Sequence, residues 1–414
     1  MGFFSKSAAP VTARAAPRGK PAAQSTGVAI TGLGLACHAG DRPCELICSV
    51  LGQISGVRLS DAHKVKPREG GANVMSRIAP VQDVHDIRAA VRMQTLAATA
   101  LANIEEQLPD NIEAEKLLIV LMVNPELITH HDKIDPLPLQ QSLLEETTSL
   151  DTATFRILSN STASSSSALR TAIAEMHQGK WQAILLGGAD SLISMDTCIK
   201  LNEAQRLNTT ASRAGLVPGE AAAFVLLQSS DEAANNTTPT LAYLSGLGIA
   251  AEPNARNADL EATEGLTSAI NQALAQAGIQ SADIQGIVHS LGAETAQSLE
   301  WYQTTQAIWP RRVSEQQRMA VQLGEIKQAD LPDDPLPKTI LPHLTMGEVG
   351  AAAFPIQLAV ALAWIAYDTH QSKWGLPVRN HLLVCDTPEA AERGAIIIST
   401  QLTSKNQPAS QPAS

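Results

Sequence analysis

The segment from Ser159 to Asp190 constrains the fold most strongly, because a turn, a helix and a buried strand follow one another there without a gap. Small hydroxyl residues at its start predict a tight turn. A strand expected over residues 183–186 ends at Gly187-Gly188. Between them lies an amphipathic helix that Gly179 is positioned to end, with one apolar face formed by Ala168, Leu169, Ala172, Ile173 and Met176. This unit is typical of layered α/β folds.

Strands and helices alternate along most of the chain, which predicts the α/β fold class. Residues 124–158 read as an irregular, proline-containing insertion over the surface. The nearly all-apolar stretch 349–365 predicts a helix in the centre of the layers, where Pro355 can introduce a kink. The other expected elements are a first strand from Gly27, helices within 89–107, 266–277 and 296–308, and strands within 117–123, 215–227, 241–249, 285–288, 382–385 and 395–398.

The breaker-rich stretch from Ser229 to Pro239 is the expected boundary between two halves. We expect an N-terminal half over residues 27–235 and a C-terminal half over residues 240–402. A basic tail over residues 1–26 and a QPAS-repeating tail over residues 403–414 are expected to be disordered. The basic tail lacks the continuous apolar region of a secretory signal, and an organelle transit peptide is the alternative interpretation.

Charge and hydropathy exclude several classes of function. The 30 basic and 41 acidic residues give a net charge of −11, which argues against nucleic-acid or membrane-surface binding because phosphate recognition needs clustered positive charge. No apolar run approaches the ~20 residues needed to cross a bilayer, so we expect no membrane span. The chain of 414 residues is 44% hydrophobic and long enough for two core-bearing halves.

The five cysteines form no disulfide framework, and their odd number suits a reducing cytoplasm. We expect small buried core cysteines. Cys44 and Cys48 lie one helical turn apart, but a metal site would need two further ligands nearby. The adjacent His130 and His131 point in different directions on any regular element. We therefore expect neither a metal nor a cofactor.

Five segments together resemble the β-ketoacyl synthase family of the thiolase superfamily, in the family's order and nearly at its spacing. They are GVAITGLGLACHAGD (27–41), ALRTAIAEMHQGKWQAILLGGAD (168–190), SRAGLVPGEAAAFVLL (212–227), AGIQSADIQGIVHSLGAET (277–295) and KTILPHLTMGEVGAAA (338–353). The resemblance spans residues 27–400. It implies a duplicated five-layer α-β-α-β-α fold, and a homodimer as the usual state.

The same resemblance assigns positions to the catalytic groups of the family. The family's nucleophile is a cysteine, but residues 159–190 contain none, and the position falls on Thr162 or Ser164 depending on the anchor. A hydroxyl is a poor nucleophile without a general base, and Ser and Thr are also ordinary helix caps.

The histidine and turn motifs are also implied by the resemblance. The first histidine falls on His289, or on Ser290 when the preceding strand is the anchor. Lys338 and His343 keep the family spacing. The glycine-acid turn of the family corresponds to Gly215, Gly219 and Glu220. The family's C-terminal Gly-Phe-Gly-Gly loop, which completes an oxyanion hole, is replaced by DTPEAAERG.

The resemblance implies three possible functions, all related to acyl-thioester chemistry. The first is a non-catalytic member with weakened or lost condensing activity, acting as a chain-length-type subunit or a secretion-associated adaptor. The second is an acyltransferase with a hydroxyl nucleophile that takes acyl groups from carrier-protein or CoA thioesters. The third is a malonyl-thioester decarboxylase that uses the histidines. The partners implied are a second copy or a related synthase, an acyl carrier protein, or a secreted effector.

Overall fold

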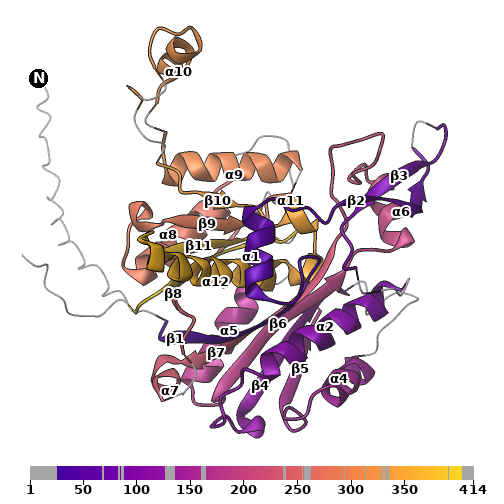
Figure 1. Cartoon of the computed structure of the whole chain (residues 1–414), viewed down its shortest axis with the longest axis vertical. Coiled ribbons are helices and arrows are strands. Elements are labelled where there is room, and N and C mark those ends of the chain that lie inside the picture. Colours follow the sequence, from indigo (N-terminus) through magenta and orange to yellow (C-terminus); the bar gives the residue numbers. More distant parts are fainter. Residues whose placement is uncertain are drawn as a thin grey trace, which may run out of the picture.

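The computed structural model describes residues 26–67, 70–82, 84, 88–125, 136–159, 165–235, 239–253, 255, 263–292, 294–311, 313–327, 330–331, 335–389 and 391–402. Its main element is a ten-stranded sheet in the order β10-β9-β11-β12-β8-β1-β7-β6-β4-β5, and a two-stranded sheet, β2-β3, stands beside it. Figure 1 shows the C-terminal elements of the main sheet above the N-terminal ones.

The N-terminal half contributes the strands at one end of the main sheet. Its strands are β1 (Val28–Ala36), β4 (Leu117–Val123), β5 (Thr154–Leu158), β6 (Ala183–Ser191) and β7 (Glu220–Ser229), with β2 (Arg58–Val65) and β3 (Val74–Ile78) in the small sheet. Its helices are α1 (Pro43–Leu51), α2 (Ala89–Glu105), α4 (Pro136–Glu145), α5 (Ser165–His177), α6 (Met195–Glu203) and α7 (Ser230–Ala234). β5 and β6 pair in parallel with β4, whereas β7 runs antiparallel to both β6 and β1.

The C-terminal half repeats this topology. Its strands are β8 (Ala242–Ala251), β9 (Gly286–His289), β10 (Thr339–Ile340), β11 (His381–Asp386) and β12 (Glu392–Ser399), and its helices are α8 (Gly265–Ala277), α9 (Thr295–Ile308), α10 (Glu315–Gln322), α11 (His343–Met346) and α12 (Ala353–Gln371). β10 and β11 pair in parallel with β9, whereas β12 runs antiparallel to β11 and β8. Strand order and direction are the same in both halves, which join where β1 pairs with β8. The expected duplication is therefore present.

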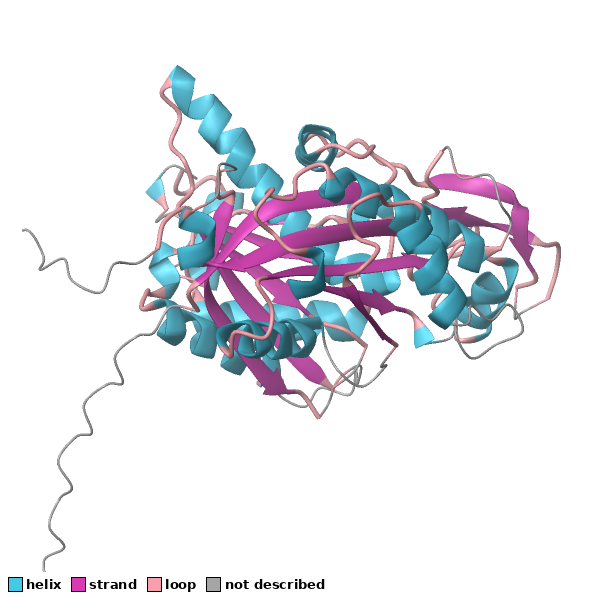
Figure 2. Cartoon of the chain, turned by 90° about the horizontal axis from the view of Figure 1, so that it is seen from below, coloured by secondary structure: helices cyan, strands magenta, loops and turns pink. Residues whose placement is uncertain are grey.

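Helices cover both faces of the main sheet, as Figure 2 shows from below. α5 contacts β6 and β7 of one half and β8 and β12 of the other, and α12 likewise contacts strands of both halves. α2 packs on the outer face of β1, β6 and β7, and α8 packs on the outer face of β8 and β12. The order α2, sheet, α5 with α12, sheet, α8 is the five-layer arrangement expected from the sequence.

α12 is the central helix predicted from the apolar stretch. The segment Gly350–Trp374 is long and apolar enough to cross a membrane, and it is the one such segment found in the part of the chain that the structure describes. Its most apolar window is 72% buried inside the protein, as expected for a core helix. Pro355 lies in the first turn of α12, where a missing N–H breaks no helical hydrogen bond, so the expected reason for a kink does not apply.

Two expectations from the sequence were wrong. The stretch 124–158 is not an irregular insertion, because it contains α4 and the edge strand β5. Cys44 and Cys48 are exposed on α1 and do not belong to the core, whereas Cys37, Cys198 and Cys385 are buried. A short helix, α7, forms within the stretch expected to separate the halves, and the proposed limits of the halves remain predictions.

Candidate functional site

A cavity of about 880 Å³ lies between the halves and is the candidate site. Its wall includes the end of β6, the first described turn of α5, the start of α12 and the loop after β11, through Asp190, Ser165, Phe354 and Thr387. The two candidate nucleophile positions, Thr162 and Ser164, lie outside the described residues. The residues that follow them along the chain therefore define this wall of the site.

Asp386 holds the start of α5 from the opposite half of the molecule. Its Oδ2 accepts hydrogen bonds from the backbone N–H of Ser166 (3.0 Å) and from the Ser166 hydroxyl (2.8 Å). Both residues are buried, and burial raises the pKa of the Asp386 carboxyl to about 6. A Cβ on the neighbouring Gly394 would lie 1.8 Å from Ser166 Oγ, so only glycine allows this close approach. A carboxylate therefore occupies the positive end of the helix that follows the nucleophile position.

Asp190, in the N-terminal half, makes the corresponding contact with the C-terminal half. It lies near the end of β6, the strand that matches β11 in the duplication, and its Oδ2 accepts a hydrogen bond from the Ala351 N–H (2.9 Å) at the turn leading into α12. Gly350 has a φ of +52°, and a Cβ there would lie 1.9 Å from Asp190 Oδ2. Burial raises the pKa of Asp190 to about 7, although hydrogen bonds from Ala351, Ser191 and Asn124 oppose that rise. Each half thus caps the central helix of the other with a buried carboxyl group.

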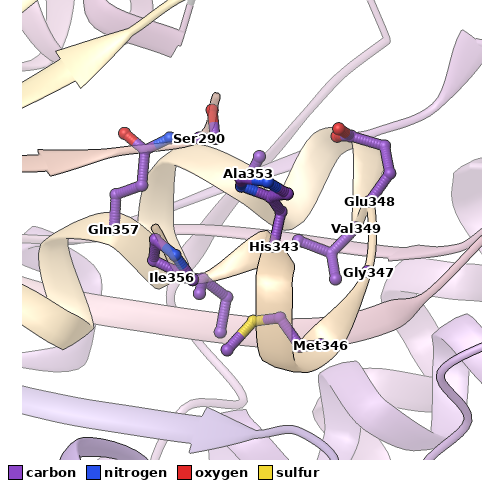
Figure 3. A pocket seen from close by; sticks show the side chains of 10 residues that line it. Ser290, His343, Met346, Gly347, Glu348, Val349, Ala353, Ile356 and Gln357 are labelled. Carbon is purple, nitrogen blue, oxygen red and sulfur yellow. The ribbon is translucent and has the colours of Figure 1, made fainter. Parts of the chain in front are cut away.

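His343 and Ser290 face a second, much smaller cavity of about 10 Å³, room for about one water molecule. Figure 3 shows the His343 ring and the Ser290 side chain around this cavity, with Gln357 beside Ser290. The His343 Nδ1 has no hydrogen-bond partner among the described atoms, and burial lowers the pKa of His343 to about 4. His343 is therefore neutral at pH 7 and has one free ring nitrogen.

Gln357 fixes the backbone around this small cavity. With its amide oriented to satisfy both ends, its NH₂ donates to the Cys385 carbonyl (2.6 Å) and its oxygen accepts from the Ser290 N–H (3.1 Å) and hydroxyl (2.5 Å). Gln357 is buried on α12, so the ends of β9 and β11 are tied together from the central layer. The Ser290 hydroxyl is consequently engaged with an amide oxygen.

His289 lies on the opposite face of β9 from Ser290 and lines neither cavity. Its ring stacks on Trp301 of α9, with centroids 4.7 Å apart, and its Nε2 lies 3.4 Å from the Thr387 hydroxyl. Burial lowers the pKa of His289 to about 3, with smaller effects in the same direction from the neighbouring His343 and from the positive charge of Arg393. The structure therefore places Ser290, the alternative position for the first histidine, at the cavity and turns His289 toward the outer layer.

Lys338 is also away from the cavities. It is exposed just before β10, and its Nζ lies 5.9 Å from the centroid of the Trp364 ring. Lys338 and His343 keep their expected spacing along the chain, but only His343 lines a cavity. Of the three assigned catalytic side chains that the structure describes, His289, Lys338 and His343, only His343 lines a cavity, and that cavity is the small one.

The glycine-acid turn is a structural support of the site. A Cβ on Gly219 would lie 2.1 Å from the Met346 carbonyl oxygen, and Gly215, with a φ of +121°, would place one 2.5 Å from the Arg206 carbonyl oxygen. Glu220 is fully buried, forms an ion pair with Arg92, and accepts a hydrogen bond from the Ser191 hydroxyl (2.8 Å). This turn packs against the loop after His343, because the Gly219 N–H donates to the Glu348 carbonyl (2.8 Å).

Two sets of ion pairs hold the loop that replaces the family's glycine loop. Arg393 donates to Glu300 in a buried pair (Nε to Oε1, 2.6 Å) and to the Pro388 carbonyl (3.2 Å). Arg206, which lines the large cavity, pairs with both Glu294 and Glu389. Burial acts to lower the pKa of its guanidinium, but the two carboxylates together outweigh burial and raise that pKa. The loop after β11 is thus held by charged side chains.

The sequence reasoning missed Asp190, Asp386 and Gln357. An apolar strand that ends in an acidic residue was a signal for both carboxyl groups, because a buried charge needs a partner. Their partners lie 161 and 220 residues away along the chain, so the contacts themselves had no local signal. Within the described ranges no group of three or more His, Cys, Asp or Glu side chains is arranged for a metal ion, and His130 and His131 lie outside those ranges.

Comparison with known proteins bears on the fold and on one segment of the sequence. Residues 156–233 match the family model of the β-ketoacyl synthase N-terminal domain. Nodulation protein E of Rhizobium sp. (strain N33) is 29% identical over 146 residues, and the match covers 33% of this chain but only 36% of that protein.

Solved ketosynthase structures have the same fold. The ketosynthase ApeO in complex with its chain length factor ApeC from Xenorhabdus doucetiae gives a TM-score of 0.66 at 16% identity, covering 91% of this chain and 98% of that one. The ishigamide ketosynthase/chain length factor gives a TM-score of 0.61 at 17% identity, covering 90% of this chain and 99% of that one. An oxazolomycin ketosynthase domain from Streptomyces albus JA3453 gives a TM-score of 0.67 at 13% identity, covering 91% of this chain and 75% of that one. Duplicated topology and structural likeness show that the chain has the fold of these ketosynthases, and within it residues 156–233 are similar to the N-terminal domain of the β-ketoacyl synthases.

Proposed function

We propose that this chain is a non-condensing, ketosynthase-like subunit that pairs with a related ketosynthase. The observation that carries the proposal is the Asp386 carboxylate, which accepts the N–H and hydroxyl of Ser166 at the start of α5. In a condensing enzyme that positive helix end would stabilise a thiolate. Here a carboxylate already uses it, and a second anion close by would be repelled.

The nucleophile position supports the same proposal. Residues 159–190 contain no cysteine, so a hydroxyl would have to attack the thioester, and a hydroxyl needs a general base within hydrogen-bond reach. Among the described histidines, His343 is the one that lines either cavity, and its cavity has room for about one water molecule. The hydroxyl acyltransferase is therefore the less supported alternative.

Decarboxylation of a malonyl thioester is supported still less. That chemistry, as implied by the family, needs two histidines directed at one carbonyl group. His289 stacks on Trp301 in the outer layer, whereas His343 faces the small cavity on the other side of β9. The two rings therefore do not converge on a common position in either cavity.

Pairing with a related ketosynthase draws support from the relatives and from the sheet edge. Two of the similar structures are complexes or pairs of a ketosynthase with a chain length factor. In this chain β5 is the last strand of the main sheet, pairs with β4 among the described strands, and carries the partly exposed Phe155 and Ile157. An edge strand with apolar side chains is a natural pairing surface for another chain.

Native co-purification tests this function. The tagged full-length chain is expressed in its own host, recovered under native conditions, and analysed by native mass spectrometry. We expect a one-to-one complex with a protein of the ketosynthase family. Ile157→Lys, on the edge strand β5, should release the partner, whereas the control Leu323→Lys, at the exposed residue that caps the C-terminus of α10, should not. Recovery of the chain only as a self-dimer would contradict the proposal.

A further inference from the structure

The helix α1 presents two free thiols on its solvent face. Cys44 and Cys48 are four residues apart and both exposed, whereas Leu46, Ile47 and Val50 are buried beneath the same helix. Residues four apart on a helix lie one above the other, so the two thiols are neighbours. The helix is held in place by packing against α12. The pair therefore has a fixed spacing on a supported element.

That spacing does not suit a disulfide. The Cβ atoms of residues four apart on a helix are separated by about 5–6 Å, whereas a disulfide needs about 3.5–4.5 Å. A single atom bonded to both sulfurs lengthens the bridge, because each metal–sulfur bond adds about 2.3 Å. The intact helix therefore favours a sulfur–metal–sulfur bridge over a sulfur–sulfur bond.

We propose that Cys44 and Cys48 form a two-thiolate binding site for a soft, thiophilic monovalent cation of the copper(I) type. Two thiolate ligands suit such a cation, since soft sulfur ligands select Cu(I) and no further protein ligand is required. Binding converts one Cu(I) ion and two thiols into a copper dithiolate carrying one negative charge, with release of two protons. No electron is transferred, and no oxidant or reductant is consumed.

The remaining cysteines do not compete for the ion. Cys37, Cys198 and Cys385 are buried in separate parts of the core. Burial raises the pKa of Cys37 and of Cys198 to about 11 and raises the pKa of Cys385 as well, so their thiols resist deprotonation. Binding should therefore saturate at one ion per chain.

Competition with a chromophoric Cu(I) chelator tests the site on the reduced full-length protein. Wild type and the control Cys198→Ala, which removes a buried thiol, should each bind one Cu(I) per chain. Cys44→Ser and Cys48→Ser should each weaken binding by at least about 10–100-fold, because loss of a residue that only supports a ligand already costs that much. Circular dichroism checks that both variants keep their helices. Affinity unchanged in either single variant would overturn the proposal.

Oxidation gives an independent readout. Treatment of the folded protein with diamide should produce no 44–48 disulfide, whereas the same treatment in 8 M urea, roughly the concentration at which small domains are unfolded, should produce it, as detected by peptide mass spectrometry. Formation of that disulfide in the folded protein as fast as in urea would show that α1 does not hold the thiols apart, and would overturn the proposed bridge.

Discussion

Asp386, at the end of β11, receives two hydrogen bonds from Ser166, at the start of α5, although 220 residues separate them. Asp190 makes the matching contact with Ala351 before α12. The duplication places both aspartates on equivalent strands, so each half caps a central helix of the other. The contact matters for function because it sets a carboxylate where a condensing enzyme would hold its reactive anion.

Removing the Asp386 carboxylate should destabilise the protein. Asp386→Ala leaves the buried N–H and hydroxyl of Ser166 without an acceptor, which costs about 1–3 kcal/mol of unfolding free energy. Urea denaturation monitored by circular dichroism measures the change. Asp110→Ala, at an exposed position, serves as the control and should change little. Equal midpoints for the two variants would show that the cap contributes nothing.

Asp190 should make the protein less stable as pH rises. Burial raises its folded pKa from 3.8 to about 7, so the folded state holds the proton more tightly than the unfolded state. Its contribution is full below pH 4 and is lost as pH rises through about 7. As pH rises from 5 to 8, the unfolding free energy of Asp190→Asn should therefore increase relative to that of wild type, by roughly 1–3 kcal/mol. Parallel pH profiles for the two proteins would refute this assignment.

His289 should make the protein less stable as pH falls. Its folded pKa is lowered from 6.5 to about 3, so the unfolded state takes up the proton first and stability falls as pH drops below about 6.5. His289→Phe keeps a ring against Trp301. The variant should lose less unfolding free energy than wild type between pH 7.5 and pH 5, by up to about 2 kcal/mol. The exposed His177→Phe is the control. An unchanged acid profile in His289→Phe would contradict the burial of a neutral imidazole.

Glu220 should be among the most sensitive polar positions. It is fully buried against Arg92, and Glu220→Gln would leave that guanidinium buried beside a neutral amide. Breaking a buried pair in this way costs about 3–5 kcal/mol. Thermal unfolding compares it with Glu113→Gln, which breaks the exposed Lys116 pair and should have no measurable effect. Similar melting temperatures for the two variants would argue against a supporting role for the glycine-acid turn.

The layered fold could be predicted from the sequence where elements were long and strongly patterned, as in α2, β4 and α12. β5 was missed because a five-residue edge strand with half-exposed side chains, preceded by prolines, has neither a buried run nor a clear alternation. Leu46 and Ile47 mark the buried face of α1, so the exposure of Cys44 and Cys48 on its other face could have been predicted. α4 was missed because it lies within the same proline-containing stretch and itself begins with two prolines, Pro136 and Pro138.

The candidate site was harder to predict because its contacts join distant segments. Strand alternation already separates His289 from Ser290, but only the assembled layers show which face meets the cavity. The capping of α5 by Asp386 depends on the packing of one half against the other. The missing cysteine was visible in the sequence, whereas the carboxylate that occupies the helix end was not.

Intact-protein mass spectrometry after incubation with acyl and malonyl thioesters of CoA and acyl carrier protein tests the central claim most directly. The account predicts an unchanged protein mass and no carbon dioxide release from the malonyl thioesters, because the start of α5 is capped by Asp386 and the two histidines face different layers. A stable acyl adduct that disappears in Ser164→Ala or Thr162→Ala would contradict it and would establish a hydroxyl-nucleophile acyltransferase.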